Sequence, residues 1–120
     1  MILYLDTSGE MCKVWLDEDY TEYRMGRELA RDLLGVIQKR VGHMRKLTGI
    51  AFMKGAGSFT GLRIGATAAN TMAEYLGVPI VGEKGPTWRA RAKKRLSLGE
   101  NDKMVLPEYD KPANVTKPKK

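Results

Sequence analysis

The sequence contains the stretch Gly55-Ala56-Gly57-Ser58-Phe59-Thr60-Gly61-Leu62-Arg63-Ile64-Gly65, which is rich in glycine and hydroxyl residues. An apolar run at 49–53 precedes it and predicts a strand, and the residues from about 62 to 76 predict a helix dominated by small side chains. Glycine permits close backbone approach, and Ser58 or Thr60 can cap the helix by accepting hydrogen bonds from its first amides. The stretch therefore predicts a tight turn between a strand and a helix.

The free amides at the start of such a helix also suit an anion, which leaves two interpretations of the turn. It can bind a phosphate, or it can serve only to cap and position the helix. The phosphate motifs match poorly, because a Walker A loop requires Gly-Lys-Ser or Gly-Lys-Thr and Leu62 follows Gly61 here. The dinucleotide fingerprint requires Gly or Ala where Thr60 stands, and it belongs to the first strand-helix unit of a sheet.

Three strands and a helix are predicted before the strand that leads into this turn. Apolar or alternating residues predict strands at 2–5, 11–16 and 20–25, the first two as a hairpin. A helix is predicted from about 27 to 42, with Gly42 as its C-cap. Its apolar positions are Leu29, Leu33, Leu34, Ile37 and Val41. With a last strand at 78–81, the order is β-β-β-α-β-α-β, an α/β fold with a mixed five-stranded sheet and two main helices.

The charge of the chain changes after residue 82. The length of 120 residues suits one domain with one modest core, and the chain carries a net charge of +7. Residues 1–82 hold 10 Lys or Arg against 9 Asp or Glu, whereas 83–120 hold 11 against 5. We expect a globular part at 1–82, a basic extension at 83–112 and a disordered tail at 113–120. Within the extension, a short basic helix is expected at 89–98 and a small strand at 104–106.

Several classes of protein are excluded by composition. No apolar stretch is long enough for a membrane span, and the N-terminal residues predict a strand rather than a signal peptide. Cys12 is the only cysteine and His43 the only histidine, so an internal disulfide is impossible and an ordinary zinc site is not expected. A single cysteine is typical of a cytoplasmic protein.

Three segments together resemble the TsaB (YeaZ) family. The stretch 55–65 is similar to that family's signature, with Ala56 where the family usually has Pro. The opening Ile2-Leu3-Tyr4-Leu5-Asp6-Thr7-Ser8 and the segment Leu76-Gly77-Val78-Pro79-Ile80-Val81-Gly82 resemble two further family segments in the same order. Family members are about twice as long and have two actin-like lobes. Since 106–112 resembles the family's C-terminal ending, the resemblance implies one actin-like (ribonuclease H-like) lobe, with the second replaced by a short basic stretch.

The resemblance implies an accessory role. TsaB-like proteins are non-catalytic scaffolds for TsaD, the subunit that places a threonylcarbamoyl group on adenosine in certain tRNAs. Nucleotide and metal are then expected on that partner, with no cofactor or metal in this chain, and a TsaE-like ATPase joins the assembly. A homodimer in the absence of the partner and contact with tRNA through the basic segment are left open. The alternative function is a small RNA-binding module that acts through 83–120.

The resemblance and the residue pattern assign three sets of site residues. The family motif comprises Asp6, Thr7, Ser8, Gly55, Gly57, Ser58, Phe59, Thr60, Gly61, Arg63 and Gly65. The outer faces of the two helices are expected to bind the partner through Leu34, Val41, Met44, Thr67, Thr71 and Tyr75. The candidate RNA contacts are Arg89, Arg91, Lys93, Lys94 and Arg95. For Asp6, a carboxylate near metal and phosphates, as in actin-like ATPases, competes with a simple cap of the first turn.

Overall fold

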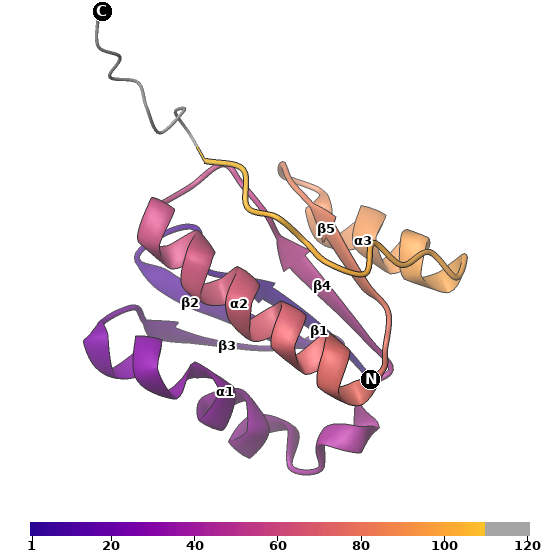
Figure 1. Ribbon diagram of the computed structural model, residues 1–120, viewed down its shortest axis with the longest axis horizontal. Helices are drawn as coiled ribbons and strands as arrows, with labels where there is room; N and C mark the ends of the chain where they lie inside the picture. The colour runs from indigo at the N-terminus through magenta and orange to yellow at the C-terminus, as the bar shows by residue number, and fades with distance from the viewer. Residues whose placement is uncertain (110–120) are drawn as a thin grey trace, which may run out of the picture.

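A five-stranded mixed sheet forms the centre of the molecule (Figure 1). The computed structural model describes residues 1–109. The strands are β1 (Ile2–Asp6), β2 (Met11–Leu16), β3 (Asp19–Arg24), β4 (Gly49–Met53) and β5 (Ile80–Glu83). Their order across the sheet is β3-β2-β1-β4-β5. The first three strands are antiparallel neighbours, whereas β4 and β5 run parallel to β1. The predicted α/β fold with a mixed five-stranded sheet is therefore confirmed.

Helices cover both faces of this sheet. Helix α1 (Arg27–Val41), the short 3-10 helix η1 (Met44–Lys46) and helix α2 (Phe59–Leu76) lie on one face, and helix α3 (Trp88–Ser97) lies on the other (Figure 1). The main core fills the space under α1 and α2, and a smaller cluster packs α3 on β1, β4 and β5. No helix within residues 1–109 combines the length and apolarity that crossing a membrane requires.

The alternation of β2 explains how the core is divided between the two faces. Cys12, Val14 and Leu16 are buried on the side of α1 and α2, while Lys13 is exposed and Trp15 half-buried on the side of α3. Burial raises the pKa of the Cys12 thiol to about 12, with a smaller contribution from the charge of Asp6. Cys12 is therefore a neutral core residue at physiological pH, because the thiolate is the reactive form of cysteine.

Helix and strand boundaries agree with the sequence at some elements and differ at others. The bounds of β4 and the C-cap at Gly42 are as predicted. Helix α2 begins at Phe59 rather than at Leu62, because Ser58 already caps it. The predicted strand at 104–106 is wrong: Met104 lies in a bend, Val105 and Leu106 join no strand ladder, and the bridge that follows links Glu108 to Gly55.

We call residues 101–109 the strap, because this segment crosses the sheet face beside α2 (Figure 1). Val105 is buried, and a Cβ on Gly82 of β5 would lie 2.7 Å from its Cγ1 atom. The Asn70 side chain of α2 donates to the Val105 carbonyl at 2.9 Å and accepts from the Val105 amide at 2.8 Å. Part of the predicted basic extension thus belongs to the packed layer. The predicted disordered tail at 113–120, and residues 110–112, lie outside the described part of the chain.

Candidate functional site

The glycine-rich turn packs against the turn that follows β1. The Asp6 carboxylate accepts hydrogen bonds from the Ser8 amide at 2.9 Å and from the Ser8 hydroxyl at 2.6 Å. The Ser8 carbonyl in turn accepts from the Ser58 amide at 2.9 Å. Asp6 therefore caps its own turn, and this turn anchors the start of α2.

Close backbone approach explains the glycines of the motif. The buried Thr7 hydroxyl donates a hydrogen bond of 2.7 Å to the Gly61 carbonyl, which draws the first turns of α2 onto the end of β1. A Cβ on Gly61 would collide with the Thr7 carbonyl, and one on Gly65 would collide with the Thr7 hydroxyl and lie 2.7 Å from Phe52. The motif thus fixes the position of α2 on the sheet.

The Ser58 hydroxyl caps α2 by accepting a hydrogen bond from the Gly61 amide at 3.2 Å. We expect Ser58→Ala to lower the free energy of unfolding by about 1 kcal/mol, the usual loss for a removed N-cap. Thr60→Ala is the matched control. Thr60 is the other residue that the sequence predicted as a possible cap, and in the structure it is exposed inside the helix. Urea denaturation measures both; equal losses would contradict the assignment of Ser58 as the cap.

The outward side chains of the motif lie beside the end of the strap. The Phe59 ring is half exposed and packs on Tyr109 with ring centroids 4.6 Å apart. The Arg63 guanidinium lies over the same Phe59 ring, 5.5 Å from its centroid. The first turn of α2 therefore presents an aromatic and a cationic group to solvent.

The predicted partner residues divide between surface and core. Leu34, Thr67, Thr71 and Tyr75 are exposed, with 76% of Tyr75 accessible, and Met44 is half-buried in η1. Val41 does not belong to this surface. It is 4% exposed and packs in the main core, because the last turn of α1 points it at the sheet together with Ile37.

Two shallow hollows follow the groove between α1 and α2. The first lies near the start of both helices and is lined by Ala30, Thr60, Arg63, Ile64 and Thr67. The second lies at their other end, where Met44 and Tyr75 meet beside His43. The groove therefore brings together Thr67, Met44 and Tyr75 on one side of the molecule, while Leu34 projects from the middle of α1.

The arginines of α3 are engaged within the chain. Arg89 lies over the Trp15 ring, 4.4 Å from its centroid, and within 3.9 Å of Glu18. Arg91 binds Glu83 at 3.0 Å, whereas Lys93 and Lys94 are exposed. The predicted RNA contact by these five residues stays a prediction. The buried stripe of this helix was missed, although Trp88, Ala92 and Leu96 recur at the spacing of one helix face.

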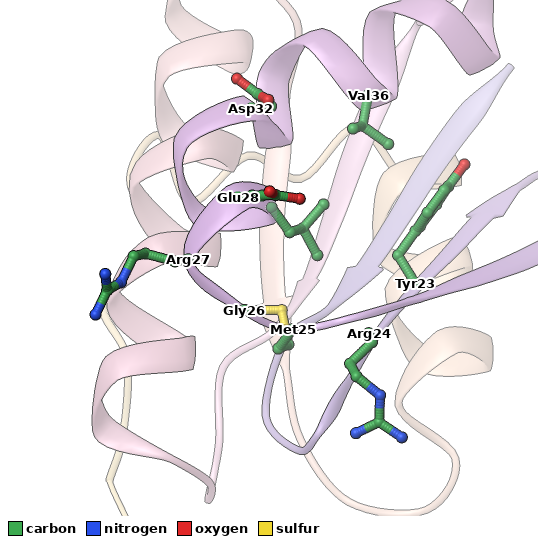
Figure 2. Close-up of a pocket in the computed structure, with 9 residues that line it drawn as sticks. Tyr23, Arg24, Met25, Gly26, Arg27, Glu28, Asp32 and Val36 are labelled. Atoms are coloured by element: carbon green, nitrogen blue, oxygen red, sulfur yellow. The ribbon is translucent and has the colours of Figure 1, made fainter.

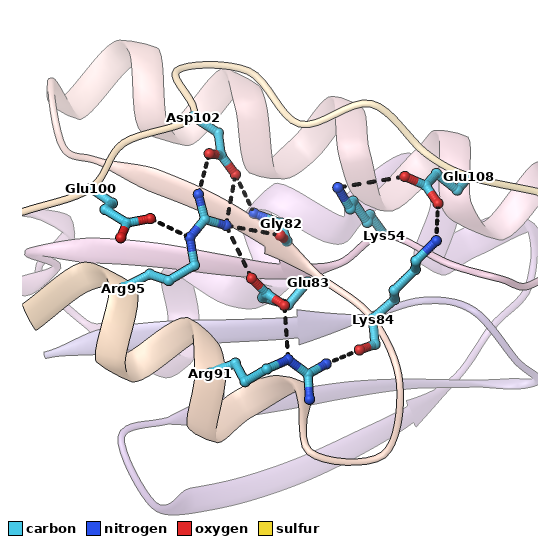
Figure 3. A network of polar contacts seen from close by, with 9 residues as sticks. All are labelled: Lys54, Gly82, Glu83, Lys84, Arg91, Arg95, Glu100, Asp102 and Glu108. Atoms are coloured by element: carbon cyan, nitrogen blue, oxygen red, sulfur yellow. Dashed lines mark hydrogen bonds and ion pairs between the residues drawn. The ribbon is translucent and has the colours of Figure 1, made fainter. Parts of the chain in front are cut away.

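Arg95 is the centre of an ion-pair network that ties α3 to β5 and to the strap (Figure 3). Its guanidinium binds Glu83 at 3.2 Å, Glu100 at 2.6 Å and the Asp102 carboxylate. Although burial alone would raise the pKa of Asp102, the hydrogen bond from Arg95 holds it below its usual value. The Asp102 carboxylate therefore stabilises the fold above the pKa it has when unfolded, and this contribution is lost as pH falls through the lower folded value.

A second ion-pair group holds the end of the strap. Lys84 and Lys54, which follow β5 and β4, both bind Glu108, the latter with 3.5 Å between Nζ and Oε2 (Figure 3). The hydrogen bond from Lys84 lowers the pKa of Glu108 below its usual value. Since all three side chains are solvent-accessible, these ion pairs position the end of the strap but contribute little to the free energy of unfolding.

A further hollow lies away from the motif, between β3 and the start of α1 (Figure 2). It measures about 720 Å³ and is wide open to solvent. Arg24 and Arg27 line it together with Glu28 and Asp32, so no single charge dominates. The sequence predicted no site there.

Within residues 1–109, no three His, Cys, Asp or Glu side chains gather as metal ligands would.

The comparisons with known proteins agree with this fold and motif. Residues 27–94, from the start of α1 into α3, match the sequence model of the family described as "TsaD: tRNA N6-adenosine threonylcarbamoyltransferase". A tRNA threonylcarbamoyladenosine biosynthesis protein TsaB from Haemophilus influenzae is 30% identical over 83% of this chain and 46% of its own length. The TsaB from Buchnera aphidicola subsp. Schizaphis graminum is 28% identical over 87% of this chain and 56% of its own.

Solved structures give the same result. YeaZ from Pseudomonas aeruginosa superposes with a TM-score of 0.57 at 25% identity, over 82% of this chain and 49% of that one. A second structure, described as similar to peptidase YeaZ from the same organism, has a TM-score of 0.55 at 23% identity and supports the fold alone. The chain spans about half the length of the relatives it matches. Since the family model covers more than half of the chain, the chain belongs to the family which that model describes, and the curated relatives and solved structures confirm its resemblance to the TsaB (YeaZ) proteins.

Proposed function

We propose that this chain is a non-catalytic accessory subunit in the synthesis of threonylcarbamoyladenosine in tRNA, and that it binds and stabilises a TsaD-like catalytic subunit. The observation that carries the proposal is the outer face of α1 and α2. Thr7 and the motif glycines hold α2 against the end of β1, and α1 packs beside α2, with Leu34 and Tyr75 exposed on the two helices. Exposed apolar groups mark a surface that binds another protein where they form a contiguous patch.

Two features of the turn favour this role over phosphate chemistry. The Ser58 hydroxyl already occupies the Gly61 amide of α2, and Asp6 is engaged by Ser8. Each of these two groups thus caps the turn in which it lies instead of facing an open site. The nucleotide, the metal and any TsaE-like ATPase belong, in this proposal, to the partner and its assembly.

A direct role in RNA binding is the competing function. Arg89, Arg91 and Arg95 each contact an acidic residue of the same chain, which leaves fewer free cations than the sequence of α3 predicts. If the purified chain binds tRNA alone and forms no complex with a TsaD-like subunit, the accessory role is wrong and the RNA-binding function replaces it.

The partner surface can be tested with Leu34→Asp. Leu34 is 41% exposed, so we expect a change in unfolding free energy within about 0.5 kcal/mol. Binding to the TsaD-like subunit of the same organism should weaken at least about tenfold, since a charge would be buried at the interface. Isothermal titration calorimetry measures the affinity. Leu98→Asp, at an equally apolar exposed position after α3, is the control and should bind as the unaltered chain does.

A further inference from the structure

The exposed apolar side chains of the molecule are unevenly distributed. Five of the eight large ones within residues 1–109 lie on the layer formed by α1, α2 and the strap. They are Leu34, Phe59, Tyr75, Met104 and Leu106. Two of the five belong to the strap, which lies outside the helix pair that the sequence predicted as the partner surface.

The strap is held against α2 at two points. Near the middle of α2, Asn70 binds both the amide and the carbonyl of Val105. At the start of α2, Phe59 packs on Tyr109. The rise of α2 from Phe59 to Asn70 is about 16 Å, and an extended chain from Val105 to Tyr109 spans about 13 Å. The strap therefore runs antiparallel to α2 and stays beside it from Asn70 to the first turn.

The two neighbours of Val105 in the strap differ from it in exposure. Val105 is directed at Gly82 in the sheet and is 2% exposed. Met104, which lies in a bend, is 62% exposed, and Leu106 is 68% exposed. Two large apolar side chains of the strap are therefore available at the surface on either side of its buried anchor.

We propose that Met104 and Leu106 form a third ridge of the partner-binding surface, next to the ridges of α1 and α2. This inference rests on the proposed function, and its occupant is the same TsaD-like subunit. A partner that packs on α2 meets these side chains as well, because the strap is joined to α2 at Asn70 and Phe59. The matching surface on the partner is expected to be apolar where it faces Leu106.

The test compares Leu106→Asp with Leu34→Asp in the full chain, again by calorimetry with the TsaD-like subunit. We expect each to weaken binding about tenfold or more, with Leu98→Asp unchanged. Thermal denaturation verifies that the variants fold, and Met104→Asp provides a second variant at the same ridge.

The outcomes separate the two proposals. If Leu34→Asp weakens binding and neither Leu106→Asp nor Met104→Asp does, the third ridge is wrong and the helix-pair surface stands. If none of the three variants changes the affinity, the proposed surface itself is wrong. If both strap variants weaken binding while they remain folded and Leu98→Asp does not, the third ridge is confirmed.

Discussion

Gly65→Ala is expected to lower the free energy of unfolding by about 2 kcal/mol, even though alanine is a better helix former than glycine by about 1 kcal/mol. The added methyl group would collide with the Thr7 hydroxyl and with Phe52, and both belong to the packed core. Relief of the collision requires α2 to move away from β1, which breaks the hydrogen bond from Thr7 to the Gly61 carbonyl. Overpacking of this kind typically costs about 1–3 kcal/mol, and the hydrogen bond adds about 1 kcal/mol.

Gly35→Ala is the matched control for this substitution. Gly35 lies in the interior of α1, is exposed, and has no atom within 4 Å of the position that a Cβ would take. The same change should therefore raise the free energy of unfolding by about 0.5–1 kcal/mol. Urea denaturation of both variants checks the pair. A stabilised Gly65→Ala variant would show that α2 does not lie as close to β1 as the motif requires.

Val105→Ala is expected to lower the free energy of unfolding by about 2 kcal/mol, because it removes two methyl groups from a buried site over Gly82. Leu106→Ala removes a larger side chain from the next position, yet it should change stability by less than about 0.5 kcal/mol because Leu106 is exposed. The contrast between adjacent residues tests whether the strap is packed with Val105 inward. Equal effects would contradict that orientation.

Periodic patterns predicted most of the fold, and they did so where burial follows the local sequence. The apolar run of β4 and the helical spacing of Leu29, Leu33 and Ile37 gave the correct elements, because each element packs one defined face on the sheet. The same spacing placed Val41 on the outer face, and the structure places it in the core. A five-residue apolar pattern is wider than the stripe that one helix face buries, so spacing alone does not decide which of its members remains exposed.

The strap could not be predicted in this way. The position of Val105 depends on Gly82 and on the side chain of Asn70, which are distant in sequence. A short apolar run such as 104–106 is compatible with a strand as well as with an irregular packed segment, and the sequence therefore predicted a strand. The sequence predicted that the glycines at 61 and 65 belong to a motif. Only the structure explains why glycine is needed there, because Thr7 lies too close for a side chain at either position.

Hydrogen–deuterium exchange of the complex with a TsaD-like subunit tests the central claim most directly, because it locates the contact on the unaltered chain. The account predicts a stoichiometric complex in which amide exchange slows along 27–41 and 59–76, with further protection at 104–108 if the strap contributes. A complex in which protection is confined to α3, or a chain that binds no TsaD-like subunit at all, would contradict it.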